Sequence, residues 1–171
     1  MKKAIVHLIT GGQRSGKSEY AEQVTLVKSS SAIYLATSKI WDDEYQNRVD
    51  THTARRGEEW STIEEEMNIA SLELEGKTVL MDCITLWLTN IFDAFEYDQF
   101  KTLEFAQKQW DGFLMKEIEV IVVGNEIGLG VIPMDKGTRS FVDIHGMMNQ
   151  YIAKSANEVT LMVAGIPMKV K

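Results

Sequence analysis

Short hydrophobic runs alternate with longer polar stretches along most of this chain. The runs with the length of a β-strand are Ala4–Ile9, Ala32–Ala36, Thr78–Asp82, Val120–Gly124, Val159–Ala164 and Met168–Val170. The polar stretches between them carry hydrophobic residues at helical spacing. Strands that are apolar on both faces and alternate with helices are typical of a mostly parallel sheet that helices cover on both sides. The pattern therefore predicts an α/β fold.

The end of the chain departs from this alternation. Only Ala164–Pro167 separates the last two runs, which is too short for a helical crossover but sufficient for a tight turn. We therefore expect a C-terminal antiparallel hairpin. The chain has 171 residues, no internal repeat and no Pro/Gly-rich linker, so we expect residues 1–171 to form a single domain.

A glycine-rich segment follows the first hydrophobic run and precedes a helical pattern. It reads Gly11, Gly12, Gln13, Arg14, Ser15, Gly16, Lys17 and Ser18, which matches the P-loop motif G-x-x-x-x-G-K-[ST] at every fixed position. Backbone N–H groups and the positive end of a helix dipole bind phosphates in such a loop. Lys17 would neutralise the β- and γ-phosphates, and Ser18 would ligate Mg²⁺. A glycine-rich turn without a ligand is the alternative, but the flanking strand and helix favour a P-loop.

Two further features fit a P-loop protein. The segment after the motif carries hydrophobic residues that would dock a helix on the sheet: Tyr20, Ala21, Val24 and Val27. Asp82 ends a predicted strand, where P-loop enzymes usually place a carboxylate that serves Mg²⁺. An acidic residue at this point can also cap the next helix, expected around Ile84–Phe95, so Asp82 is the weaker indication.

Composition narrows the possible partners and the compartment. The net charge of −7 gives no basic field for binding nucleic acid, so we expect no nucleic-acid partner. No apolar run is long enough to span a membrane. A single cysteine, Cys83, and the absence of a signal-peptide pattern at the start lead us to expect a cytoplasmic protein.

A predicted helix over 42–56 places a histidine among arginines. Arg48, His52 and Arg55/Arg56 fall at i, i+4 and i+7/i+8, so they share one helix face. Clustered cations are favourable when an anion lies between them, and the positive charge would keep an imidazole neutral and nucleophilic. A solvated polar helix face explains the same spacing, which leaves both interpretations open.

Together these motifs resemble the bifunctional adenosylcobinamide kinase/adenosylcobinamide-phosphate guanylyltransferase family of cobalamin biosynthesis. The similarity covers nearly all of the chain and keeps the order and spacing of the family's motifs. It rests on Thr10–Ser18, Ala36–Ser38, Asp42–Glu44, the spacing of Arg48, His52, Arg56 and Trp60, Asp82–Thr85, Asn125–Gly130, Arg139, Phe141, Asp143, Gly146, Asn149, Gln150 and Ala164–Pro167.

The resemblance implies two successive reactions on a corrinoid side chain. ATP or GTP would first phosphorylate a hydroxyl of adenosylcobinamide, and GMP from GTP would then pass to that phosphate to give adenosylcobinamide-GDP. The second step would run through a histidine that carries GMP, at the position of His52, with Lys17 and Arg56 as further catalytic residues. Besides 11–18, the resemblance places these residues at the nucleotide: Ala36, Thr37, Ser38, Arg55, Arg56, Gly57, Glu64 and Asp82. Mg²⁺ would be the cofactor, held by Ser18 and Asp82.

Two positions depart from the family pattern. Thr53 stands where Lys or Arg is usual after the histidine, and Gly57 replaces a customary proline. Arg55 could restore the missing positive charge if its side chain reaches the same phosphate. The departures therefore bear on guanylyl transfer more than on phosphorylation.

Two other functions are compatible with the P-loop alone. A kinase for a different small alcohol would transfer the γ-phosphate without any adduct between GMP and the protein. A non-catalytic nucleotide switch would bind GTP or ATP without turning over a corrinoid. His52 and the segment Asn125–Gly130 favour the bifunctional enzyme over both.

The size of a corrinoid also bears on assembly. A large flat substrate finds little wall area on one small domain, so we expect a neighbouring copy to complete the pocket in a homo-oligomer, as is common in the family. Aromatic residues between Trp87 and Trp110 could form such an interface or pack in the core.

Overall fold

The computed structural model describes residues 4–39 and 56–171. The strands in these residues are β1 (Ile5–Gly11), β2 (Ala32–Ala36), β3 (Trp60–Glu64), β4 (Thr78–Asp82), β5 (Glu119–Asn125), β6 (Glu158–Val163) and β7 (Ile166–Lys169). The helices are α1 (Lys17–Lys28), α3 (Ile84–Ala94), α4 (Gln99–Phe113), α5 (Lys136–Ser155) and the 3₁₀ helix η1 (Ile69–Ser71).

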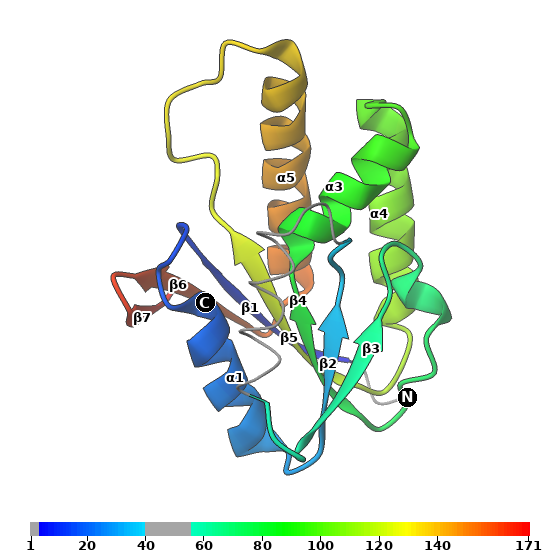
Figure 1. The fold of residues 1–171 in the computed structure, drawn as a ribbon, viewed down its shortest axis with the longest axis vertical. Coiled ribbons are helices and arrows are strands. Elements are labelled where there is room, and N and C mark those ends of the chain that lie inside the picture. Colours follow the sequence, from blue (N-terminus) through cyan, green and yellow to red (C-terminus); the bar gives the residue numbers. More distant parts are fainter. Residues whose placement is uncertain (1–3, 40–55) are drawn as a thin grey trace.

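The described strands form one sheet in the order β3-β2-β4-β5-β1-β6-β7. Neighbouring strands are parallel except β6 and β7, which pair antiparallel. Helix α1 packs on one face of the sheet, and α3, α4 and α5 lie together on the other (Figure 1). The predicted α/β fold with a mostly parallel sheet and a C-terminal hairpin is therefore confirmed.

Alternating side chains of the strands build two hydrophobic layers. On β2, Ile33 and Leu35 join the larger layer under α3, α4 and α5, whereas Tyr34 joins the smaller layer under α1. The larger layer includes both Trp87 and Trp110, which are fully buried. The core interpretation of these two tryptophans is therefore correct, and Phe92 joins them, whereas Tyr97 and Phe100 between them are exposed.

The helix after the glycine-rich segment docks differently from the sequence-based expectation. Ala21 is buried as expected, but Val27 is 88% exposed, so its predicted packing role is wrong. Thr25 takes the docking position, because it lies one helical turn after Ala21, and its hydroxyl donates to the Ala21 carbonyl oxygen at 2.7 Å. That bond satisfies the hydroxyl and lets a polar residue face the core.

At the two edges of the sheet, the strands differ from those expected from the sequence. The strand β3 was not predicted, because Ser61, Thr62 and Glu64 are exposed and the segment has no hydrophobic run. At the other edge, the turn needs only Ala164 and Gly165, both with positive φ (50° and 82°). This two-residue turn lets β7 begin earlier than predicted. No helix among the described residues is long and apolar enough to cross a bilayer.

Candidate functional site

The glycine-rich segment forms a tight connection between β1 and α1. A Cβ on Gly11 would lie 2.6 Å from the carbonyl oxygen of Met162, so no other residue fits there without movement of the backbone. Gly16 is the N-cap of α1 and has a φ of 89°, a left-handed conformation that suits glycine. The first N–H groups of a helix have no partners within it and carry a partial positive charge. Strand, loop and helix thus form the local arrangement that binds a phosphate.

Lys17 supplies a positive charge inside this loop. Its side chain is largely buried, and Nζ donates a 2.6 Å hydrogen bond to the carbonyl oxygen of Gly12. Burial lowers the pKa of Lys17, while the nearby Cys83 and Asp82 act in the opposite direction. A phosphate bound in the loop would offer this ammonium group a stronger, charge-assisted partner than the carbonyl.

Two hydroxyls beside the loop are also available to a ligand. Oγ of Ser15 and Oγ1 of Thr10 are buried and have no hydrogen-bond partner among the described residues. An unpaired buried hydroxyl costs about 1–3 kcal/mol. A phosphate oxygen or a bridging water within hydrogen-bond distance of either hydroxyl would therefore be favourable. The remaining loop residues are exposed (Gly12, Gln13 and Arg14) or half-buried (Gly16 and Ser18).

Strand pairing brings other predicted site residues to the same edge of the sheet. Ala36 is opposite Asp82 on β4 and Glu64 on β3, and Gly11 is opposite Asn125 on β5. Each of these residues ends its strand. Because the strands are parallel, their carboxyl ends lie together with the glycine-rich loop. Ligands of open α/β sheets bind at this edge.

A single aromatic side chain contacts two predicted site residues. The hydroxyl of Tyr34 donates a 2.7 Å hydrogen bond to Oδ2 of Asp82. The guanidinium carbon of Arg56 lies 3.7 Å from the centroid of the Tyr34 ring, and its Nη1 donates to Oγ1 of Thr62 at 3.2 Å. Asp82 does not cap α3, since Cys83 is the N-cap residue. Arg56 and Asp82, which are distant in sequence, therefore meet around Tyr34.

Thr37 has a different environment from its neighbours. It is fully buried; its hydroxyl donates to the Cys83 carbonyl oxygen at 2.9 Å, and its own carbonyl oxygen accepts Nδ2 of Asn90 at 2.7 Å. These bonds fix the segment that follows β2 against α3. Ser38 is half-buried beyond it, and Gly57 is exposed, with its carbonyl oxygen accepting the Trp60 N–H at 3.2 Å.

The oxygen donors of the site suit Mg²⁺. In nucleotide-dependent enzymes this ion is usually held by one or two protein groups together with phosphate oxygens and waters. The Ser18 hydroxyl and the Asp82 carboxylate are half-buried oxygen donors of this kind. Residues 4–39 and 56–171 contain no cluster of three His, Cys, Asp or Glu side chains that would hold a metal without a nucleotide.

Two predicted residues, His52 and Arg55, lie outside the described residues, as do the predicted neighbours Arg48 and Thr53. Their roles therefore stay predictions. Arg56 and Gly57 are the first described residues after this segment and lead directly into β3.

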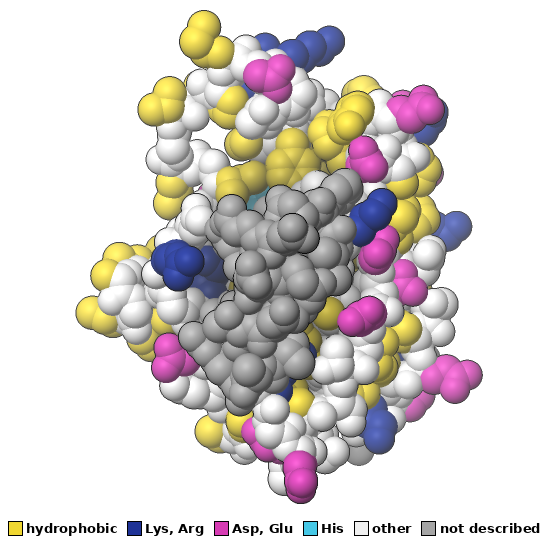
Figure 2. All heavy atoms as spheres, in the orientation of Figure 1, with side chains coloured by type: hydrophobic (Ala, Val, Ile, Leu, Met, Phe, Trp, Pro, Cys, Tyr) yellow, Lys and Arg dark blue, Asp and Glu magenta, His cyan; other side chains and the backbone are white. Residues whose placement is uncertain are grey.

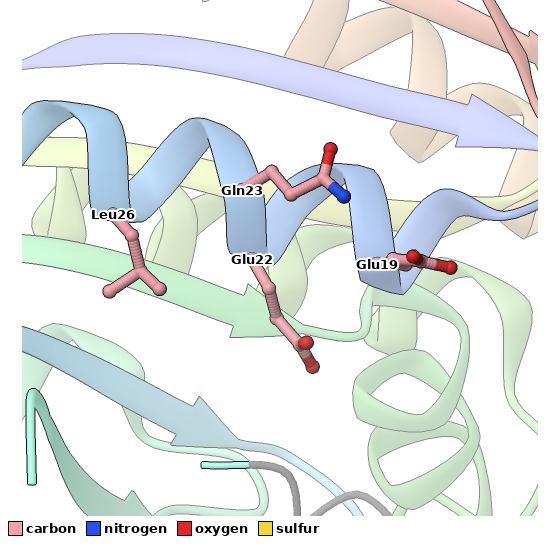
Figure 3. A pocket seen from close by; sticks show the side chains of 4 residues that line it. All are labelled: Glu19, Glu22, Gln23 and Leu26. Carbon is pink, nitrogen blue, oxygen red and sulfur yellow. The ribbon is translucent and has the colours of Figure 1, made fainter. Parts of the chain in front are cut away.

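A shallow hollow on α1 is a poor candidate for the nucleotide. It is lined by Glu19, Glu22, Gln23 and Leu26, all from this one helix (Figure 3). Two carboxylates would repel a phosphate, and none of the four described residues that line the hollow is a lysine or an arginine. The glycine-rich loop at the sheet edge is therefore the better phosphate site.

Comparison with known proteins identifies the family. A family model described as "Cobinamide kinase / cobinamide phosphate guanyltransferase" matches residues 7–170. The chain belongs to this family. The matched range contains the glycine-rich loop, Arg56, Asp82 and the β6–β7 hairpin.

Individual relatives agree with this assignment. The bifunctional adenosylcobalamin biosynthesis protein CobP of Pseudomonas aeruginosa is 39% identical over 168 residues, which cover 96% of each chain. The bifunctional adenosylcobalamin biosynthesis protein CobU of Escherichia coli K12 is 36% identical over 185 residues, covering 96% of this chain and 98% of the relative. Among solved structures, the flagellar accessory protein FlaH from Methanocaldococcus jannaschii matches with a TM-score of 0.49 and 15% identity, over 98% of this chain and 78% of that one. That likeness is too distant to support an argument.

For this member of the cobinamide kinase / cobinamide phosphate guanyltransferase family, sequence reasoning missed two residues that organise the site. Tyr34 lies within a hydrophobic run, and only the structure shows that it contacts Asp82 and Arg56. Asn90 lies inside α3, and its side chain supports Thr37 by donating to the Thr37 carbonyl oxygen. The available signal for Tyr34 was its phenol hydroxyl, which is the polar group in an otherwise aliphatic strand that leads into Ala36–Ser38.

Proposed function

We propose that this protein phosphorylates adenosylcobinamide with a nucleoside triphosphate and then transfers GMP from GTP to the adenosylcobinamide phosphate. The single observation that carries the proposal is the convergence of Gly11–Ser18, Asp82 and Arg56 at one edge of the sheet, in a chain of this family. The relatives named above carry "bifunctional" in their names, which agrees with two reactions. Residues 1–171 would act as one domain.

In the first reaction, the glycine-rich loop holds the β- and γ-phosphates, and Lys17 leaves the Gly12 carbonyl to pair with them. The corrinoid hydroxyl attacks the γ-phosphorus and releases its proton to water, while the bond from that phosphorus to the β-phosphate oxygen breaks. The products are adenosylcobinamide phosphate and a nucleoside diphosphate. Mg²⁺, held by Ser18 and Asp82 with the nucleotide, would supply neutralisation of the phosphate charge.

In the second reaction, a ring nitrogen of His52 attacks the α-phosphorus of GTP and pyrophosphate leaves. A phosphate oxygen of adenosylcobinamide phosphate then attacks the same phosphorus, the P–N bond breaks, and His52 is regenerated with adenosylcobinamide-GDP as product. Arg56 would stabilise charge on the α-phosphate, and Ala36, Thr37, Ser38, Arg55, Gly57 and Glu64 would surround the nucleotide. Because Thr37 is buried and bonded to backbone groups, it would act by holding its two neighbours in place.

Labelled GTP tests this function and separates it from its alternatives. The protein is incubated with Mg²⁺ and GTP labelled at the α- or the γ-phosphate, quenched, and compared with His52→Ala. We expect an acid-labile α-label on the wild type that is absent from His52→Ala, and γ-phosphate transfer to adenosylcobinamide. Turnover of the γ-phosphate without any α-label would indicate a simple kinase. Nucleotide binding without either product would indicate a switch.

We also propose that a second copy of the chain completes the corrinoid site. Hydrophobic side chains stand out along the segment between β5 and α5 (Figure 2), and the exposed ones there include Leu129, Val131, Ile132 and Met134. Val131 is 96% exposed, and an exposed group of apolar side chains of this kind is typical of an interaction surface. Sedimentation should give a mass above the 19.4 kDa of one chain. A Val131→Asp and Met134→Asp double variant should shift it toward that value, and a monomeric wild type would contradict the proposal.

A further inference from the structure

Tyr34 lies between Asp82 and Arg56, two residues of the proposed site, and contacts both. Its side chain is 6% exposed and belongs to the hydrophobic layer under α1. Its hydroxyl contacts the Asp82 carboxylate, and the face of its ring contacts the Arg56 guanidinium. The residue thus makes two chemically different contacts, each with a different proposed site residue.

The hydroxyl contact orients a carboxylate without neutralising it. A phenol is neutral near pH 7, and the Tyr34 hydroxyl donates a hydrogen bond to Oδ2 of Asp82 at 2.7 Å. A lysine or arginine in the same place would form an ion pair with Asp82 and compete with a bound cation. A neutral donor fixes one carboxylate oxygen and leaves the charge available to the metal.

The ring contact gives Arg56 a fixed platform. The Tyr34 ring is held from another side by Trp60, with the two centroids 6.0 Å apart in an edge arrangement. A guanidinium group stacked on an aromatic face gains a cation–π attraction and loses little further freedom when it binds a phosphate. Arg56 is thereby kept beside the strand ends, at the edge where the nucleotide would bind.

We propose that Tyr34 is a positioning residue, whose hydroxyl sets the Asp82 carboxylate for Mg²⁺ and whose ring sets Arg56 for guanylyl transfer. This inference rests on the proposed function for the roles of Asp82 and Arg56. A positioning role can be distinguished from a packing role because substitutions can remove the hydroxyl contact and the ring contact separately. Removal of the hydroxyl should affect the metal, and removal of the ring should also affect the arginine.

Two substitutions separate the contacts, and the chain offers a matched control. Tyr34→Phe removes the hydroxyl and keeps the ring, whereas Tyr34→Leu removes both. Tyr151→Phe removes another phenol that donates to a carboxylate, since its hydroxyl lies 2.9 Å from both oxygens of Asp111, away from the site. Thermal unfolding of all three variants shows whether each remains folded.

The first measurement is the Mg²⁺ dependence of binding of a non-hydrolysable GTP analogue. We expect Tyr34→Phe to need about tenfold more Mg²⁺ for half-maximal binding, as is typical when a residue that orients a metal ligand is lost. Tyr151→Phe should match the wild type. In an Asp82→Asn background the Tyr34→Phe change should have no further effect, because its route to the metal is already gone. Equal effects in both backgrounds would overturn the hydroxyl role.

The second measurement is the rate of α-labelling at saturating Mg²⁺ and GTP. Tyr34→Leu should be at least about tenfold slower than Tyr34→Phe, and this gap should close in an Arg56→Met background. Equal rates for Leu and Phe would overturn the ring role. If the wild type takes no α-label, guanylyl transfer itself fails, whereas the Mg²⁺ titration still decides whether Tyr34 acts through Asp82.

Discussion

Nε2 of His145 lies 2.9 Å from Oγ1 of Thr85, where α5 meets α3. The same threonine oxygen accepts the backbone N–H of Asn125 at 3.2 Å, and Nδ1 of His145 lies 3.3 Å from Nδ2 of Asn149. The imidazole is 1% exposed, and burial lowers its pKa to about 4. A neutral histidine therefore links both helices to the end of β5, next to the glycine-rich loop.

This link predicts a loss of stability in mild acid. The folded-state pKa of His145 lies below the ordinary value of 6.5, so the unfolded chain binds the proton more readily as the pH falls. The free energy of unfolding should fall by about 2 kcal/mol between roughly pH 7 and pH 5 on account of this residue. Denaturant unfolding of the wild type and His145→Gln at both pH values measures the effect. An equal pH dependence in the two proteins would contradict it.

Gly11 and Gly12 should respond very differently to the same substitution. In Gly11→Ala the new methyl group would meet the Met162 carbonyl oxygen at 2.6 Å and Ser15 Oγ at 2.8 Å, whereas nothing lies within 4 Å of the corresponding position at Gly12. We expect Gly11→Ala to lower the free energy of unfolding by about 1–3 kcal/mol and to weaken GTP binding. Gly12→Ala should leave stability close to that of the wild type. Denaturant unfolding compares them, and equal losses would refute the steric explanation.

The sheet was largely predictable because most of its strands are covered on both faces. Such strands are continuous hydrophobic runs, and β2 and β4 have the predicted bounds. The edge strand β3 escaped prediction because its stability comes from pairing with β2, as between Ile33 and Ser61, and its own pattern is polar. The position of such an edge strand depends on the strand that it pairs with, and its own sequence pattern does not reveal it.

The site was predictable where one short segment forms it. The glycine-rich loop builds its cradle locally, so its motif is sufficient to find it. The sequence pattern could place Asp82 at the edge of the sheet. It could not show that Tyr34, on another strand, donates a hydrogen bond to Asp82 and contacts Arg56 through its ring. Contacts of this kind depend on strand order, which the sequence pattern left open.

Replacement of Lys17 by methionine should separate function from stability. The ammonium group is buried against a carbonyl oxygen, and burial lowers its pKa, so the charged form is less favoured there than in water. Lys17→Met should therefore keep or raise the free energy of unfolding without ligand. Phosphoryl transfer should fall by roughly a hundredfold or more, because a preorganised charge is lost. A variant that is both unstable and inactive would indicate a structural lysine instead.

Asn90→Asp should lower stability and weaken nucleotide binding, although Asn90 is not itself a proposed nucleotide-binding residue. Nδ2 of Asn90 donates to the carbonyl oxygens of Thr37 at 2.7 Å and Glu66 at 3.1 Å. An ionised aspartate would present an oxygen to those two acceptors, so we expect a loss of about 3 kcal/mol in the free energy of unfolding near neutral pH. Nucleotide binding should weaken with it, because the segment after β2 loses its support.

The effect of Asn90→Asp should depend on whether the new carboxyl group is protonated, and this dependence provides a test. A carboxyl group facing two carbonyl oxygens has a raised pKa, and once protonated it can donate to one of them. The deficit of Asn90→Asp should therefore shrink as the pH falls. Asn157→Asp is the matched control, since Oδ1 of Asn157 accepts the Val6 N–H at 2.9 Å and an aspartate keeps that bond. Circular dichroism of denaturant unfolding at several pH values compares the two variants. If Asn90→Asp is no less stable than Asn157→Asp at neutral pH, the support of Thr37 by Asn90 is not needed, and the bonds of the Thr37 hydroxyl to Cys83 and of the Thr37 N–H to the Asp82 carbonyl oxygen are sufficient to hold the segment after β2.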